Sequence, residues 1–188
     1  MSDVATRSPA DGRSIVPAKL AIWWLIASEV MVFAGALAAF LLYRATSGGT
    51  WNEPAGHLND WLATVNTLVL LASSYTMAMA FRDRDRRSLY LDATVGLGLL
   101  FLVIKAIEYS IELGAGYYPD TGEFWSFYYF LTAVHALHVL AGIVVNATLL
   151  TASLRGHDQT ARVQGAGLYW HFVDVVWIFL FPLLYLSF

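Results

Sequence analysis

The sequence contains no cysteine and few charged residues. Without cysteine, the chain cannot form disulfides, thiolate metal sites, iron–sulfur clusters or a cysteine nucleophile. Charged residues make up 13% of the 188 positions and hydrophobic residues 58%, whereas soluble domains contain about 25% charged and about 45–50% apolar residues. The mean hydropathy is +0.57. These values indicate a chain whose natural solvent is lipid.

Several functional motifs are also missing. The sequence has no phosphate-binding loop, nucleophile elbow, H-E-x-x-H zinc motif or glycine-rich dinucleotide turn. Its formal net charge of −3 and its scattered Lys and Arg residues give no basic face for nucleic acid. We therefore expect no catalytic residue, no metal site and no nucleic-acid partner.

Five hydrophobic runs are long enough to cross a bilayer, whose core of about 30 Å needs about 20 mostly apolar residues per helix. They lie at about 20–43, 61–81, 91–113, 124–153 and 166–187. Polar, glycine-containing or charged segments separate them. The sequence predicts an all-α, polytopic membrane protein, with residues 18–188 as a single five-helix domain. Residues 1–17 are polar and are predicted to form a flexible cytoplasmic tail.

The positions of Lys and Arg predict the orientation of these helices. If the N-terminus is cytoplasmic, the outer loops contain only Arg44. The inner segments then contain nine basic residues, namely Arg7, Arg13, Lys19, Arg82, Arg84, Arg86, Arg87, Arg155 and Arg162. Because cytoplasmic loops are enriched in Lys and Arg, we expect a cytoplasmic N-terminus and a C-terminus on the periplasmic or outer side.

Three ionisable residues in the predicted spans are candidates for a proton-linked role, because a charge at the bilayer centre costs about 2.5–3.5 kcal/mol on insertion scales. Glu29 lies near mid-membrane, and we expect it to carry a proton, since burial disfavours the charged form. Lys105 and Glu108 are three residues apart on one helical face. An internal ion pair is the simpler interpretation, and a proton relay or a lipid-headgroup site is the alternative. Glu112 lies one turn further out.

Three histidines and one aspartate form the remaining polar positions at membrane depth. His135 and His138 could ligate haem or zinc, but such a site needs further ligands at defined positions. Hydrogen bonding between helices is the favoured interpretation. His171 and Asp174 lie one turn apart, either as an orienting pair or as a hydrogen-bond site at headgroup level. The sequence alone does not separate these two roles.

Five stretches, one in each predicted helix, resemble the subunit III family of haem-copper oxidases. They are Trp24–Gly35, Val65–Ser74, Lys105–Tyr109, His135–Gly142 and Tyr169–Phe181. The first has an intramembrane glutamate after a serine, and the last reads almost as the family's closing signature. Their order and spacing agree with the family over residues 20–188.

This resemblance implies a non-redox subunit of a cytochrome c oxidase in the aerobic respiratory chain, multi-pass in a bacterial inner membrane. Such a subunit packs on subunit I, binds phospholipid and supports proton uptake and active-site stability. Haem and copper would reside in subunits I and II, with none in this chain, and a larger supercomplex is a further possible partner. Glu29 would face subunit I near the region of proton uptake. The polar interior and lipid contacts would involve His135, His138, His171 and Asp174.

The chain departs from the family's pattern in one respect, and several other functions also fit its sequence. Longer members have two additional N-terminal helices that form one arm of a V-shaped lipid cleft, so that cleft is not carried over to this chain. Within the family, the chain could instead be an accessory subunit of a quinol oxidase or a nitric oxide reductase. Outside it, a proton-coupled transporter could use the same buried charges, and a free-standing b-type cytochrome could use His135, His138 or His171.

Overall fold

The computed structural model describes the backbone of residues 15–157 and 160–186 and the side chains from Leu20 onward. Within these ranges the chain is helical and contains no strand. The elements are α1 (Ile15–Thr46), α2 (Asn52–Ala55), α3 (Asp60–Arg82), α4 (Arg87–Gly114), α5 (Glu123–Leu154), α6 (Thr160–Phe181) and the π-helical turn η1 (Pro182–Leu186).

All of these helices except α2 are long and apolar enough to cross a membrane. The predicted all-α fold with five spanning helices is therefore confirmed. Residues 1–14 of the predicted tail lie outside the described residues, and α1 already begins at Ile15. The short α2, which the sequence analysis did not predict, lies in the connection between α1 and α3.

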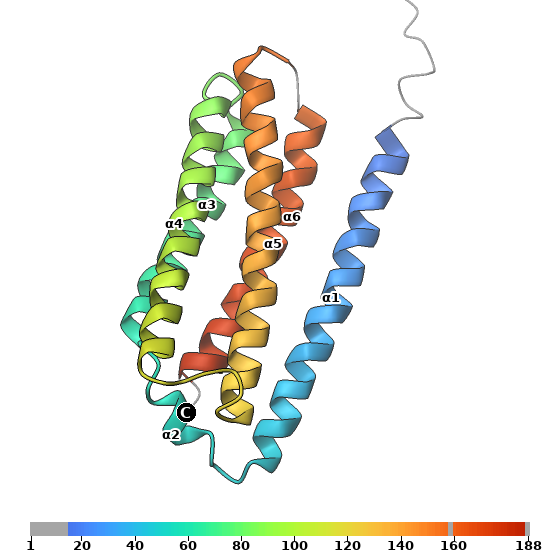
Figure 1. The fold of residues 1–188 in the computed structure, drawn as a ribbon. Coiled ribbons are helices and arrows are strands. Elements are labelled where there is room, and N and C mark those ends of the chain that lie inside the picture. Colours follow the sequence, from blue (N-terminus) through green and yellow to red (C-terminus); the bar gives the residue numbers. More distant parts are fainter. Residues whose placement is uncertain (1–14, 158–159, 187–188) are drawn as a thin grey trace, which may run out of the picture.

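Helices α3 to α6 form a four-helix bundle, and α1 stands to one side of it (Figure 1). In the bundle, α3 packs against α4 and α6, and α5 packs against the same two helices. The largest fully buried side chains of the bundle include the aromatic residues Phe101, Tyr128, Trp170 and Trp177. Outside the bundle, α1 lies closest to α6.

Trp170 of α6 lies where the four bundle helices meet. Gly98 of α4 and Gly142 of α5 make room for its ring, since a Cβ atom at these positions would lie 2.9 and 2.6 Å from indole carbons. Its Nε1 donates a hydrogen bond to Ser73 Oγ of α3 at 3.1 Å. Small residues thus allow the close helix approach that is typical of membrane bundles.

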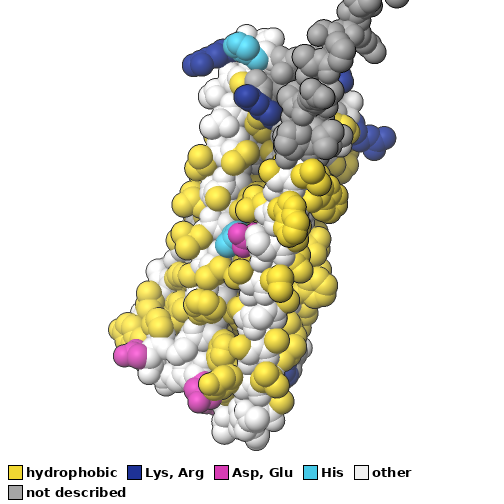
Figure 2. Space-filling view, turned by 90° about the vertical axis from the view of Figure 1, so that its right-hand side faces the viewer, with side chains coloured by type: hydrophobic (Ala, Val, Ile, Leu, Met, Phe, Trp, Pro, Cys, Tyr) yellow, Lys and Arg dark blue, Asp and Glu magenta, His cyan; other side chains and the backbone are white. Residues whose placement is uncertain are grey.

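Basic side chains gather at one end of the molecule. Figure 2 shows most of the visible Lys and Arg side chains at the end with the α3–α4 and α5–α6 connections, and acidic side chains toward the opposite end, where one basic side chain is also visible. The surface between them is mainly hydrophobic, except where a histidine and a carboxylate lie together at mid-height. This separation agrees with a cytoplasmic N-terminus, although the orientation itself stays a prediction.

Candidate functional site

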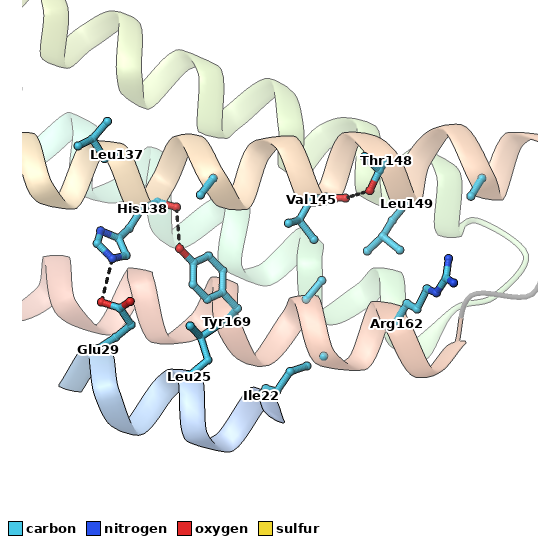
Figure 3. Close-up of a pocket in the computed structure, with 14 residues that line it drawn as sticks. Ile22, Leu25, Glu29, Leu137, His138, Val145, Thr148, Leu149, Arg162 and Tyr169 are labelled. Carbon is cyan, nitrogen blue, oxygen red and sulfur yellow. Dashed lines mark hydrogen bonds and ion pairs between the residues drawn. The ribbon is translucent and has the colours of Figure 1, made fainter. Parts of the chain in front are cut away.

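A carboxyl group of α1 and an imidazole of α5 meet at the side of the bundle. Glu29 Oε2 lies 3.0 Å from His138 Nε2, and the two side chains are 22% and 20% exposed. Figure 3 shows them pointing toward one another. The ring of Phe33, one turn beyond Glu29, packs edge-on against the imidazole at 5.0 Å. A polar contact and an aromatic contact therefore join α1 to α5 at the same level.

The second ring nitrogen of His138, Nδ1, contacts the backbone, and this contact determines which atoms of the pair carry protons. His138 Nδ1 lies 2.7 Å from the backbone oxygen of Val134. Because a carbonyl oxygen only accepts hydrogen bonds, Nδ1 must carry a proton. The contact between Nε2 and Glu29 then contains one further proton, bound either as a carboxylic acid or as an imidazolium. In both states the pair is neutral overall and can pass that proton between its two members.

The pair lies in a groove of about 770 Å³ that is bounded by α1, α5 and α6 (Figure 3). Tyr169 lines it and donates a hydrogen bond to the backbone oxygen of His138 at 3.2 Å. Arg162 lines the groove near its basic end, and Thr148 lies on the α5 side. The other lining residues are apolar or glycine: Ile22, Leu25, Leu137, Ala141, Val145, Leu149, Ala152, Gly165 and Ala166.

A second polar cluster is enclosed within the bundle. Lys105 and Glu108 of α4 form the ion pair that their spacing predicts, with Nζ 3.2 Å from Oε2 and side chains 3% and 1% exposed. Lys105 Nζ also donates to the hydroxyls of Tyr128 at 3.2 Å and Tyr185 at 2.6 Å. Both hydroxyls in turn donate to Glu108 Oε1. The buried ammonium group thus has three partners.

Aromatic rings complete the surroundings of Lys105. Its Nζ lies 4.7 Å from the centre of the Tyr128 ring and 5.3 Å from those of Tyr109 and Tyr185. Cations within about 6 Å of a ring are attracted by its negative face. Tyr185 comes from η1, the turn that follows α6. Glu112, one turn beyond Glu108, is also buried.

His135 does not form the predicted hydrogen bond between helices. Neither ring nitrogen has a hydrogen-bond partner within the described part of the chain, although the residue is completely buried. The ring instead stacks on Trp177 at 5.0 Å and meets the edge of Phe101 at 5.7 Å. Residues three apart on a helix differ in direction by about 60°, so His135 points into the bundle while His138 points toward α1.

His171 and Asp174 are close, but the stronger contact of His171 is elsewhere. Its Nδ1 lies 2.7 Å from Ser74 Oγ on α3 and 3.9 Å from Asp174 Oδ2. Asp174 is buried, and neither of its carboxyl oxygens has a hydrogen-bond partner among the described residues. The histidine therefore links α6 to α3 rather than serving only its own helix.

No group of three or more His, Asp or Glu side chains is arranged to hold a metal ion in the described residues. Both clusters consist instead of titratable side chains that pair with one another. The Glu29–His138 pair borders a groove, whereas the Lys105 cluster is sealed. Of the two, the pair at the groove is better placed to exchange a proton with a neighbour.

Comparison with known proteins decides the family. The family model described as cytochrome c oxidase subunit III matches residues 12–187. The chain belongs to the cytochrome c oxidase subunit III family. This confirms the resemblance drawn from the five sequence stretches. Oxidases of this kind act in respiratory electron transport, so the chain is a multi-pass membrane subunit of such a complex.

Relatives in several organisms carry the same description. A probable cytochrome c oxidase subunit 3 of Mycobacterium bovis is 35% identical over 172 residues, which cover 87% of this chain and 84% of the relative. A cytochrome c oxidase subunit 3 of Synechocystis is 36% identical over 171 residues, with 86% and 72% coverage. In Aeropyrum pernix, a haem-copper oxidase subunit I+III is 33% identical over 180 residues, covering 88% of this chain and 22% of the relative.

Sequence reasoning missed two members of the Lys105 cluster and one contact of His171. Tyr128 and Tyr185 supply hydroxyls from α5 and η1, and Ser74 contacts His171 from α3. Tyrosine in a span is a weak signal by itself, because such residues also anchor helices at the interface. The number of hydrogen-bond donors on Lys105 could have pointed to these partners. An ammonium group has three N–H donors, and Glu108 alone does not accept from all of them.

We predict that Lys105→Met destabilises the protein by about 3–5 kcal/mol, because it leaves the carboxylate of Glu108 buried without its cation. Thermal unfolding of the purified protein in detergent would measure the loss. The double variant Lys105→Met/Glu108→Leu removes both charges and should recover most of the stability. Equal losses in the single and double variants would contradict this account of the pair.

Proposed function

We propose that this chain is the non-redox subunit III of a cytochrome c oxidase in a bacterial inner membrane, with its N-terminus in the cytoplasm. Haem and copper are carried by subunits I and II, and this chain supports proton uptake and the durability of the active site. The observation that carries the proposal is the 3.0 Å contact between the Glu29 carboxyl and the His138 imidazole beside a groove. The family match supplies the complex in which this pair operates.

We propose that α1 provides the contact with subunit I. Its surface carries large apolar side chains, with Trp24, Met31 and Leu42 exposed by 76%, 78% and 68%. Such a face suits either lipid or a neighbouring transmembrane helix. A relative named as a fused subunit I+III favours the second, because it joins the two subunits in one polypeptide.

The two polar clusters have different roles in this proposal. Glu29 lies on the side of α1 that faces His138 of α5, away from the exposed Trp24 and Met31, and we propose that its pair accepts and releases a proton. Lys105 and Glu108 are sealed by tyrosine hydroxyls and aromatic rings. They act structurally, by neutralising each other so that α4 can lie in the membrane.

The groove between α1, α5 and α6 is proposed to bind an acyl chain of a phospholipid. Its α5 wall runs from Leu137 to Ala152, a length of about 22 Å at 1.5 Å per residue. This exceeds half of a hydrocarbon core of about 30 Å. Arg162 at the basic end would lie at the level of the phosphate.

Isolation of the complex tests the function directly. With a tag at the N-terminus and gentle extraction from native membranes, we expect a haem-containing subunit I and a copper-bearing subunit II in equal amounts. A reduced-minus-oxidised spectrum identifies the haems and distinguishes cytochrome c oxidase from a quinol oxidase or a nitric oxide reductase. A haem-free preparation containing this chain alone would refute the proposal.

Glu29→Gln is expected to preserve assembly but to slow proton uptake or shorten the working life of the complex severalfold. Glutamine can still donate a hydrogen bond to His138 Nε2, but it has no proton to release. Turnover and inactivation would be recorded across pH in the purified complex. Asp60→Asn, which removes a carboxylate at the start of α3, is the control. Unchanged turnover and lifetime at every pH would rule out this role.

Val145→Trp should reduce the phospholipid that copurifies with the complex, because the indole would fill the groove. Val144→Trp is the matched control, since Val144 is 56% exposed but does not line the groove. Lipid phosphorus per haem measures the difference. Equal lipid content in the two variants would argue against an acyl chain at this site.

A further inference from the structure

A second cavity opens at the end of the bundle opposite the basic connections. It has a volume of about 490 Å³, within the range of about 300–1,000 Å³ that is usual for ligand pockets. Two connections build it: the one between α1 and α3, which contains α2, and the one between α4 and α5. In the proposed orientation this cavity faces the outside of the cell.

The lining contains a rigid aromatic stack. The Tyr117 ring lies on that of Trp125, with centres 4.5 Å apart and planes at 12°. His57 stacks on Tyr117 at 4.9 Å. Trp51 also lines the cavity, and Trp51 and Trp125 are only 4% and 3% exposed. Because the two tryptophans are almost fully covered, the surface that the stack offers to a partner comes from Tyr117, which is partly exposed, and from His57, whose side chain is 42% exposed.

Carboxylates complete the lining. Glu53 and Glu123 line the cavity, and the side chain of Glu53 is 85% exposed, with Oε1 3.2 Å from His57 Nε2. The segments 47–60 and 114–123 contain two further acids, Asp60 and Asp120, and no Lys or Arg. The local potential is therefore negative and attracts cationic groups.

These features fit a long basic side chain better than other ligands. Lys and Arg combine an apolar stem with a cationic head, which matches an aromatic surface next to carboxylates. A lipid phosphate would find no Lys or Arg among the lining residues. Nor do the described residues provide a metal-binding group of three or more His, Asp or Glu side chains here.

We propose that this cavity docks a Lys or Arg side chain of a neighbouring subunit on the outer face of the oxidase. The docking goes beyond the proposed function and relies on it only for the presence of neighbouring subunits and the outward orientation. Because Glu53 is exposed, its attraction to the basic side chain is screened by salt. Such contacts chiefly determine which partner binds and in which register.

Photo-crosslinking in the intact complex, in native membranes, tests this docking. A benzoylphenylalanine would replace Thr121, which lines the cavity, and a second one would replace Trp24 on the exposed face of α1. From position 121 we expect a crosslink to a polypeptide segment that contains Lys or Arg. Glu53→Gln together with Glu123→Gln should lower its yield about fivefold, as expected for the loss of one or two exposed ion pairs.

The matched control is Asp60→Asn together with Asp120→Asn. It removes the same charge from the same two connections but from residues outside the cavity lining, and should leave the yield at position 121 nearly unchanged. The yield at position 24 should not respond to either double substitution. Charge reversal of the crosslinked basic residue combined with Glu53→Lys should restore the yield at position 121.

Several results would overturn the docking. These are a crosslink to phospholipid only, a crosslink to a segment without basic residues, or a yield that falls equally in both double variants. If position 24 reacts with subunit I while position 121 reacts with no polypeptide, the docking alone is wrong. If neither position reacts with another subunit, the placement of the chain in the complex is wrong, and the docking is wrong with it.

Discussion

An ammonium group in the hydrocarbon layer has no water to bind, and the protein must supply every one of its partners. Lys105 meets this condition with a carboxylate and two phenolic hydroxyls, which come from α4, α5 and η1. This requirement constrains more than one side chain, because it brings α4, α5 and η1 together at one point. The close approach of α4, α5 and α6 around Trp170 then continues the same packing toward the opposite end of the bundle.

The contact between α1 and α5 satisfies the same condition by a different route. Glu29 and His138 are neutral as a pair, and the backbone of Val134 orients the imidazole. The Glu29–His138 pair is a contact between a carboxyl and an imidazole at a groove, whereas the Lys105–Glu108 pair is an ion pair enclosed in the bundle. This difference explains why one cluster can be sealed inside the bundle while the other is useful only at a surface that neighbours can reach.

The sequence allowed the spanning helices and the Lys105–Glu108 pair to be predicted, because both follow from local spacing. Contacts between distant residues could not be predicted in the same way. Glu29 and His138 are 109 residues apart, and their meeting depends on how α1 leans on the bundle. Tyr185 donates a hydrogen bond to Glu108 from a π-helical turn. The position of a side chain in such a turn does not follow from the 3.6-residue spacing of an α-helix. For His135, the sequence predicted a hydrogen bond between helices, whereas the ring stacks on Trp177, a residue 42 positions away that local spacing could not identify.

The geometry of the Glu29–His138 pair also limits how the membrane voltage acts on it. The two acceptor atoms are 3.0 Å apart, about a tenth of a hydrocarbon core of about 30 Å. Since a full crossing of one charge is worth about 2.3 kcal/mol per 100 mV, a transfer between the two atoms changes the free energy by at most about 0.2 kcal/mol per 100 mV. A proton transfer of the kind proposed for this pair would therefore respond only weakly to the membrane voltage.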